Sequence, residues 1–232
     1  MAKRTIGMIG GISWASSIEY YRIINKTVQE RIGGEASARL IMYSVDFSEL
    51  RSAQKNRGWD AVAEMLIDIA RRLRVGGADF LVMAANTVHI VADRVEAAVD
   101  MPLLHIADAT AGTIRAAGMK KVGLLGTRYT MTEDFYRARL KQRHGIDVIV
   151  PGEGDIERIN EIIFGELVRD VFRDESRDEV LRIAGGLVAA GAEGIVLGCT
   201  ELPLLVKPGQ IPAPSFDTLT LHAVAAAERA IA

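Results

Sequence analysis

The chain has 232 residues, of which 49% are hydrophobic and 25% charged, and its formal net charge is −2. This composition is typical of a globular protein, and the absence of a basic run argues against nucleic-acid or membrane-surface binding. No segment approaches the ~20 uninterrupted apolar residues that a membrane-spanning helix needs. The single cysteine cannot form an intrachain disulfide and suits a reducing compartment, so we expect a cytoplasmic protein.

Short β-rich segments alternate with longer helical patterns along the whole chain. The first apolar segment has the length of a strand, not that of a signal peptide. In chain order, the predicted strands are 5–9, 38–43, 79–83, 103–106, 121–125, 147–150, 194–197 and 213–216. The predicted helices are 14–31, 59–73, 88–99, 110–117, 132–143, 157–171, 177–190 and 219–231. Such alternation predicts parallel sheets with helices on both faces.

The sequence also repeats itself. Segment 6–10 (IGMIG) resembles 122–126 (VGLLG) at an offset of 126 − 10 = 116, and 77–85 resembles 191–199 at an offset of 199 − 85 = 114. Two matches in the same order at nearly one offset indicate a duplicated α/β unit. Ligands of parallel sheets bind beyond the carboxyl ends of the strands, so two facing units would enclose one cleft. Ala85 and Cys199 are then equivalent positions.

Several predicted strand ends carry polar or glycine residues. Segment 10–13 (GGIS) is either an anion-binding helix start or a tight turn, and it lacks the dinucleotide-binding glycine pattern. Asn86 and Thr87 can cap a helix, bind a ligand, or both. Thr127 and Thr130 either hold a carboxylate or cap the helix predicted from residue 132.

Cys199 lies at a predicted strand end before a turn. A lone cysteine is usually a small core residue. At this place, however, N–H groups of an adjacent helix can lower the pKa of the thiol from its usual ~8.5 and favour a nucleophilic, basic thiolate. The four histidines show no metal-ligand spacing, and no phosphate loop or serine nucleophile motif is present.

Seven segments together carry a family resemblance. They are 6–14 (IGMIGGISW), 43–47 (YSVDF), 86–89 (NTVH), 103–110 (LLHIADAT), 125–131 (LGTRYTM), 198–201 (GCTE) and 216–218 (FDT). In order and content they resemble bacterial aspartate/glutamate racemases. The resemblance implies two flavodoxin-like lobes with parallel sheets, related by a pseudo-twofold axis, with the active site in the cleft between them. We expect the first lobe at 1–102, with helix 217–232 returning to it, and the second at 103–216.

The resemblance also implies a chemistry that uses no pyridoxal phosphate or metal. Two acid/base residues, one from each lobe, act on opposite faces of the substrate α-carbon. It places one at Cys199 and the other at position 85, where relatives carry Cys or Thr and this chain has Ala85. A methyl group transfers no proton. Three explanations stay open: water or a hydroxyl such as that of Thr87 replaces the missing acid/base group, the alanine disables the enzyme, or the reaction needs only one acid.

The remaining site residues follow from the same comparison. The resemblance places Ile12 and Gln54 in the substrate pocket. Asn86, Thr87 and Thr200 are candidates for holding the α-carboxylate, because fixed donors stabilise an enediolate-like charge. The further candidates for substrate binding are Thr127, Thr130 and Glu201. For a second substrate carboxylate, Arg51, Arg57 and Arg128 are available, although each is also a typical solvated surface residue.

Three functions remain open at this point. The first is a cofactor-independent amino-acid racemase of the aspartate/glutamate type, expected to be a homodimer. The second is a decarboxylase of the arylmalonate decarboxylase type, which keeps only the second-lobe cysteine and protonates a carbanion. The third is a non-catalytic amino-acid binding protein.

Overall fold

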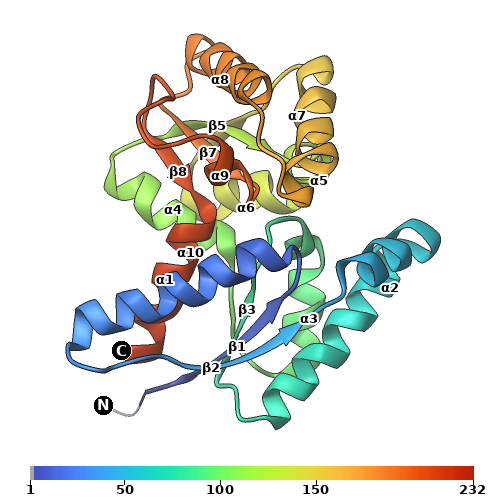
Figure 1. Ribbon diagram of the computed structural model, residues 1–232, viewed down its shortest axis with the longest axis vertical. Helices are drawn as coiled ribbons and strands as arrows, with labels where there is room; N and C mark the ends of the chain where they lie inside the picture. The colour runs from blue at the N-terminus through green and yellow to red at the C-terminus, as the bar shows by residue number, and fades with distance from the viewer. Residues whose placement is uncertain (1–2) are drawn as a thin grey trace. The chain divides into compact units, whose positions relative to one another are not determined.

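The computed structural model describes residues 3–232 and shows two compact units, each with a four-stranded sheet between helices (Figure 1). The first unit takes in the chain to Ile106 and again from His222 to Ala232, and the second runs from Ala107 to Leu221. Every strand pair in the two sheets is parallel. The predicted α/β class is confirmed, and the lobe boundaries at 102/103 and 216/217 stay predictions.

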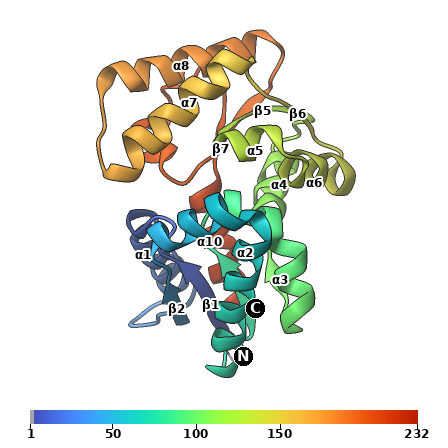
Figure 2. The ribbon, with the colours of Figure 1, turned by 90° about the vertical axis from the view of Figure 1, so that its right-hand side faces the viewer.

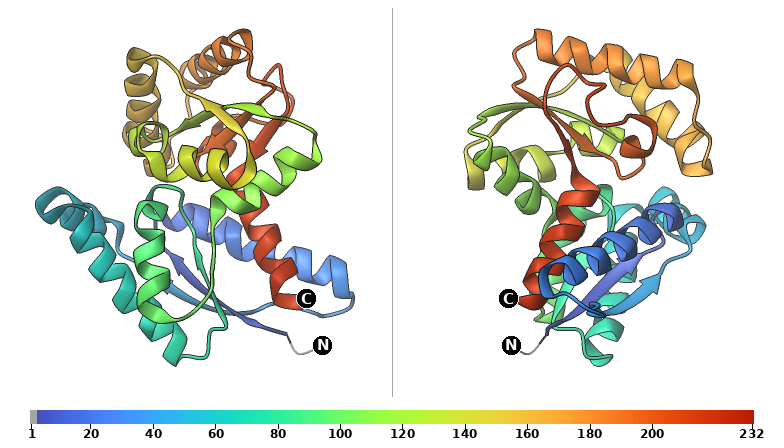
Figure 3. Two further views of the ribbon diagram at one scale, coloured as in Figure 1. Left: turned by 180° about the vertical axis from the view of Figure 1, so that it is seen from behind. Right: turned by 60° about the vertical axis from the view of Figure 1, so that its left-hand side comes forward.

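The sheet of the first unit has the strand order β2-β1-β3-β4. Helices α1 and α10 lie on one face of this sheet, and α2 and α3 lie on the other (Figure 3). The strands are β1 (Thr5–Gly10), β2 (Arg39–Ser44), β3 (Phe80–Met83) and β4 (Leu103–Leu104). The helices are α1 (Trp14–Ile32), α2 (Phe47–Val75), the 3-10 helix η1 (Thr87–Val91), α3 (Ala92–Val99) and the larger part of α10 (Thr218–Ile231).

The sheet of the second unit has the order β6-β5-β7-β8, which is the order of the first sheet, as the internal repeat predicts. Helices α7 and α8 lie on one side of it and α4 and α6 on the other (Figure 2). The strands are β5 (Lys121–Gly126), β6 (Asp147–Ile149), β7 (Gly194–Gly198) and β8 (Ser215–Asp217). The helices are α4 (Ile106–Ala116), α5 (Arg128–Thr132), α6 (Asp134–His144), α7 (Glu153–Gly165), the 3-10 helix η2 (Leu167–Arg169), α8 (Asp174–Ala189) and α9 (Leu202–Leu205).

Burial explains why these segments form the elements that they do. Strands β3 and β7 are buried throughout, which is expected of central strands covered on both faces. An apolar stripe of α2 faces the core, because Val62, Leu66 and Leu73 are at most 2% exposed. At about 25 cal/mol per Å², burying such side chains is the main stabilising term of each unit.

Some element boundaries differ from those predicted. Helix α2 begins at Phe47, twelve residues before the predicted start, and its two halves join at Gly58, whose φ of 73° is left-handed. Asp46 stabilises this earlier start by accepting a hydrogen bond from Ser48 N at 2.8 Å. The helix predicted at 132–143 is α6, which begins at Asp134, and the extended Glu133 separates it from the short helix α5 that was not predicted. Strand β4 ends at Leu104, because the next helix already begins at Ile106.

Candidate active site

In the second unit, Cys199 follows directly after β7. Gly126 and Gly198 are paired at the ends of β5 and β7, and a Cβ on Gly126 would lie 2.7 Å from the Gly198 carbonyl oxygen. Only glycine permits this approach of the two backbones. The register therefore brings Thr127 beside Cys199 at the carboxyl ends of two neighbouring strands, where parallel sheets bind their ligands.

The Cys199 thiol lies next to a carboxylate from the same turn. Its Sγ donates to Glu201 Oε2 at 3.1 Å, and Thr200 Oγ1 donates to the same oxygen at 2.9 Å. All three residues are buried, with exposed fractions of at most 6%. A buried thiol that donates a hydrogen bond to a carboxylate keeps its proton at rest.

The expected lowering of the Cys199 pKa is wrong in direction. Burial raises the pKa of the thiol well above its ordinary value, and the charge of Glu201 and its hydrogen bond raise it further. The N–H groups of Glu201 and Leu202 lower the pKa, as the sequence suggested, but they do not outweigh these effects. Cys199 is thus a thiol at rest, first because it is buried and second because the Glu201 carboxylate lies beside it.

Thr127 and Thr130 form a helix cap. Thr130 N donates to Thr127 Oγ1 at 3.3 Å, and the two hydroxyls lie 3.1 Å apart. The capping alternative is correct, although the capped helix is α5 and not one that begins at residue 132. Both threonines are buried, and they follow β5, whose last residue is paired with the last residue of β7, directly before Cys199. Their binding of a substrate carboxylate stays a prediction.

In the first unit, position 85 corresponds to position 199. Ala84 N donates to Ile9 O at 2.9 Å and so continues the pairing of β3 with β1. Ala85 follows and is 6% exposed, in an apolar cluster that also contains Ile12 and Leu50. The side chain at this position is therefore a methyl group in apolar surroundings, where relatives of the aspartate/glutamate type would present an acid/base group.

The segment after β1 forms a tight turn, which is one of the two alternatives that the sequence offered for residues 10–13. Gly11 has a φ of 85°, and a Cβ there would lie 2.2 Å from the Val45 carbonyl oxygen. Its N–H donates to Ser17 Oγ at 2.8 Å, so this donor is used within the turn. The same geometry holds Ile12 beside the end of β1.

The other predicted binding residues of the first unit lie on two elements. Asn86 is 3% exposed, makes no side-chain cap for η1, and directly follows Ala85. Thr87 is the first residue of η1. Gln54 lies in the first half of α2, before the break at Gly58, and is partly buried. Asn86 and Thr87 are thus at the same strand end as Ala85, whereas the placement of Gln54 against a substrate stays a prediction.

Two of the three candidate arginines are already paired. Arg128 bonds Glu153 at 2.6 Å and also Glu157, which lie in the first two turns of α7. Arg57 bonds Glu64 at 3.0 Å. The solvated-surface alternative is therefore the better description of Arg57 and Arg128.

The sequence suggested no role for His89, because the four histidines show no metal-ligand spacing. The ring is buried, with Nδ1 2.8 Å from Ala85 O and Nε2 3.3 Å from Ile106 N. The only signal in the sequence was the four-residue spacing from position 85. Within residues 3–232 no group of three His, Cys, Asp or Glu side chains is arranged for a metal, and no helix has the length and apolarity to cross a bilayer.

Comparison with known proteins gives a consistent result. The sequence profile of the Asp/Glu/hydantoin racemase family matches residues 9–226. A candidate Asp/Glu racemase from Yersinia pestis is 48% identical, with a TM-score of 0.92 over 99% of this chain and 100% of that one. An aspartate racemase homologue from Pyrococcus horikoshii OT3 is 36% identical, with a TM-score of 0.84 over 99% and 100%. A glutamate racemase from Synechococcus sp. (strain CC9605) is 30% identical over 65% of this chain, a match that covers 54% of that relative.

Proposed function

The chain belongs to the Asp/Glu/hydantoin racemase family, and from this premise we propose that it is a cofactor-independent amino-acid racemase of the aspartate/glutamate type. Cys199 is the acid/base residue in this proposal. The observation that supports it is the buried thiol at the carboxyl end of β7, hydrogen-bonded to Glu201. A core cysteine needs no such partner, whereas a proton-transferring thiol needs a group that can take up and return its proton.

The proposed proton transfer has two steps. The thiol proton moves from Cys199 Sγ to Glu201 Oε2, which leaves a thiolate and a carboxylic acid. The thiolate then removes the α-proton of the substrate: the S–H bond forms, and the electron pair of the C–H bond stays on an enediolate-like substrate. Because the resting pKa of the thiol is raised, the thiolate is scarce but strongly basic. Reprotonation by the same thiol reverses the transfer.

Ala85 determines the stereochemical outcome in this proposal. Racemisation requires a proton to arrive on the face of the α-carbon opposite Cys199, which the resemblance assigns to position 85. A methyl group cannot supply it, so water or the Thr87 hydroxyl takes that role. We therefore expect exchange of the α-proton with retention to be faster than racemisation.

The substrate carboxylate is held, in this proposal, by donors at the two strand ends. Fixed N–H and O–H groups are the largest available source of enediolate stabilisation. We assign Asn86 and Thr87 to this role in the first unit and Thr200 in the second. The remaining proposed pocket residues are Ile12, Gln54, Thr127, Thr130 and Glu201.

Proton exchange in heavy water tests the proposal. The parent protein is incubated with L-aspartate, L-glutamate and other L-amino acids, and α-deuterium is followed by NMR while optical purity is followed by chiral chromatography. Cys199→Ala should abolish deuterium uptake. The matched control is Ser176→Ala, which also removes a hydrogen bond to a glutamate in the second unit, the part-buried bond from Ser176 Oγ to Glu166 at 2.7 Å. Equal uptake by Cys199→Ala and the parent would show that Cys199 is not the base.

Ala85 also favours a second candidate function. A decarboxylase of the arylmalonate decarboxylase type needs only one proton donor, and a resting thiol with a raised pKa is suited to protonating a carbanion. Carbon dioxide release from a disubstituted malonate, with no exchange of any amino acid, would support it. Calorimetric binding of an amino acid without exchange would instead favour a non-catalytic binding protein. We expect a homodimer, which light scattering would test.

A further inference from the structure

The chain passes between the two units twice, and each crossing lies next to hydrogen bonds that lead to a proposed reacting position. The first crossing is between Ile106 and Ala107, and the second is between Leu221 and His222. Ile106 is the first residue of α4, and His222 lies in the second turn of α10. The bonds described below are each confined to one unit.

At the first crossing, His89 connects Ile106 to Ala85. Ala85 O can only accept and Ile106 N can only donate, so the His89 ring is neutral with its proton on Nδ1. Both bonds are present only in this tautomer. The ring of His105, the residue before Ile106, lies 4.5 Å from the His89 ring by centroid. The backbone of position 85 is thereby fixed to the segment that leaves the first unit.

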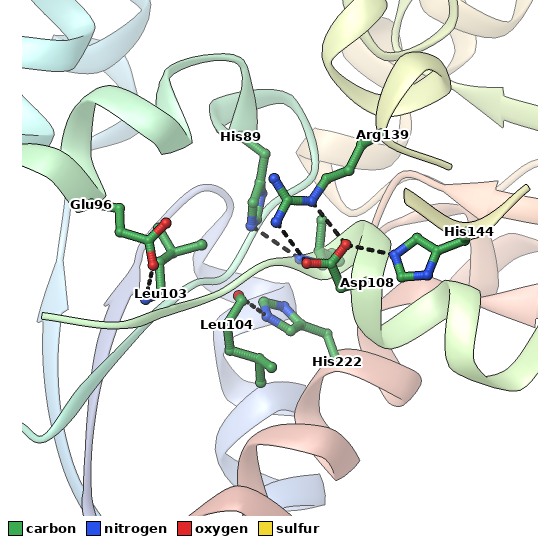
Figure 4. Close-up of polar contacts among 9 residues, drawn as sticks. His89, Glu96, Leu103, Leu104, Asp108, Arg139, His144 and His222 are labelled. Carbon is green, nitrogen blue, oxygen red and sulfur yellow. Dashed lines mark hydrogen bonds and ion pairs between the residues drawn. The ribbon is translucent and has the colours of Figure 1, made fainter. Parts of the chain in front are cut away.

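At the second crossing, Thr218 connects α10 to the strand that precedes Cys199. Thr218 Oγ1 donates to Leu197 O at 2.8 Å, two residues before Cys199. After the crossing, His222 Nε2 donates to Leu104 O at 2.8 Å (Figure 4), and its Nδ1 accepts from Tyr20 OH at 2.9 Å. The beginning of α10 is thus bonded to the second unit on one side of the crossing and to the first unit on the other.

The first crossing has a matching attachment within the second unit. Asp108, two residues after Ile106, accepts from Arg139 Nε and Nη2 at 2.8 and 2.6 Å, and it also bonds His144 Nε2 at 2.8 Å (Figure 4). These side chains are mostly buried. A bidentate arginine–carboxylate pair of this kind fixes the relative orientation of the two side chains and also adds stability.

We propose that His89 and Thr218 are positioning residues for the proposed proton transfer, which couple the two crossing segments to positions 85 and 199. Neither is a catalytic residue, because each acts through a main-chain carbonyl: His89 through that of Ala85, and Thr218 through that of Leu197, two residues before Cys199. Because of these bonds, the positions of the ends of β3 and β7 depend on the backbone at the two crossings. Any movement of one unit against the other must change the backbone there. This inference rests on the proposed function, because it assigns positions 85 and 199 to the reaction.

Paired variants test each link separately. His89→Leu removes both bonds of the ring. His89→Asn keeps a donor to the carbonyl four residues earlier, as Asn25 does to Tyr21 O at 2.8 Å in this chain, but it cannot reach Ile106. Thr218→Val removes the hydroxyl at similar volume, and Thr218→Ser restores it. Tyr20→Phe is the control for the His89 variants. It removes the buried hydrogen bond between Tyr20 and His222 in the same unit and leaves the bonds of His89 to positions 85 and 106 in place.

Hydrogen–deuterium exchange of the full-length variants measures positioning without relying on activity. His89→Leu should increase uptake in peptides covering 84–87 and 104–108, whereas His89→Asn should increase it only in 104–108. Thr218→Val should increase uptake at 197–201, and Thr218→Ser should not. Unchanged uptake in His89→Leu and Thr218→Val would overturn the inference whether or not the protein turns over an amino acid.

Steady-state α-proton exchange then tests the coupling to chemistry. For the best amino acid of the parent, kcat should fall roughly tenfold or more in His89→Leu, His89→Asn and Thr218→Val, with little change in KM, because small displacements near reacting atoms are costly. Thr218→Ser and Tyr20→Phe should stay near the parent. Recovery of kcat in His89→Asn would overturn the coupling to Ile106. A parent that exchanges no amino acid would instead contradict the proposed function, and the uptake result would still decide the positioning.

Discussion

The stability of the first unit should depend on pH through His222. The side chain is fully buried, and burial lowers its pKa from 6.5 to about 4, against the opposing effect of the Leu104 carbonyl. A histidine with a depressed pKa is neutral in the native state and binds a proton more readily when unfolded. Its contribution is therefore complete above pH 6.5 and is lost as the pH falls towards 4. A difference of about 2.5 pKa units corresponds to about 3 kcal/mol of unfolding free energy between pH 7 and pH 4.

Urea unfolding followed by tryptophan fluorescence is the appropriate assay. The two tryptophans, Trp14 and Trp59, both belong to the first unit, so the signal reports on that unit. The comparison is between Tyr20→Phe and the double variant Tyr20→Phe/His222→Gln. Tyr20→Phe is the common background because it removes the Tyr20 hydroxyl, which would lose its partner when the His222 ring is replaced. Glutamine at position 222 keeps an N–H group that can donate to Leu104 O.

Between pH 7 and pH 4, the variant that keeps His222 should lose about 3 kcal/mol more than the double variant. All other titrating groups are common to the two proteins and cancel in the difference. If both lose the same free energy, the buried histidine is not the group that titrates, and the reasoning from burial is refuted.

Three further predictions concern the two reacting positions and the crossing. Glu201→Gln should lower the pKa of the Cys199 thiol, because the carboxylate charge and hydrogen bond raise it, and the midpoint of the pH profile of iodoacetamide alkylation should shift down; an unshifted midpoint would exclude this pairing. Ala85→Cys should raise the rate of racemisation roughly tenfold or more above that of the parent, and by a larger factor than it raises one-sided exchange, as chiral analysis in heavy water would show, and a folded variant with no gain would contradict a two-sided site. Asp108→Asn should lower the free energy of unfolding by about 2 kcal/mol in urea titrations, because Arg139 loses its charged partner, and a change below ~0.5 kcal/mol would count against that pair.

Much of the fold could be predicted from the sequence, because its local signals agree with one another. Each predicted strand overlaps an observed one, since the strands are short apolar runs between clear helical patterns. The repeat of segment 77–85 in 191–199 corresponds to β3 and β7, which occupy the same place in two sheets of the same order. The first half of α2 was missed because it is largely exposed and polar, so its helical form depends on the Asp46 cap and not on an apolar stripe.

The candidate site was less predictable, because its chemistry depends on contacts that spacing does not reveal. The strand-end positions of Ala85 and Cys199 follow from the pattern alone. The direction of the Cys199 pKa does not, because it depends on which way the Glu201 side chain turns and on how deeply the thiol is buried. The pairing of Arg128 with two glutamates on α7 likewise joins elements that are about 25 residues apart in the sequence.

The two strand ends differ in a way that bears on the direction of proton flow. At position 199 a thiol holds its proton against a carboxylate, whereas at position 85 a methyl group lies in an apolar cluster. In the proposed mechanism, this asymmetry returns a proton from the side of Cys199 far more readily than from the side of position 85. The ratio of α-deuterium uptake to loss of optical purity therefore separates one-sided exchange from racemisation, because a proton donor on the side of position 85, water included, brings that ratio towards one. Decarboxylation is identified separately, by release of carbon dioxide without exchange of an amino acid.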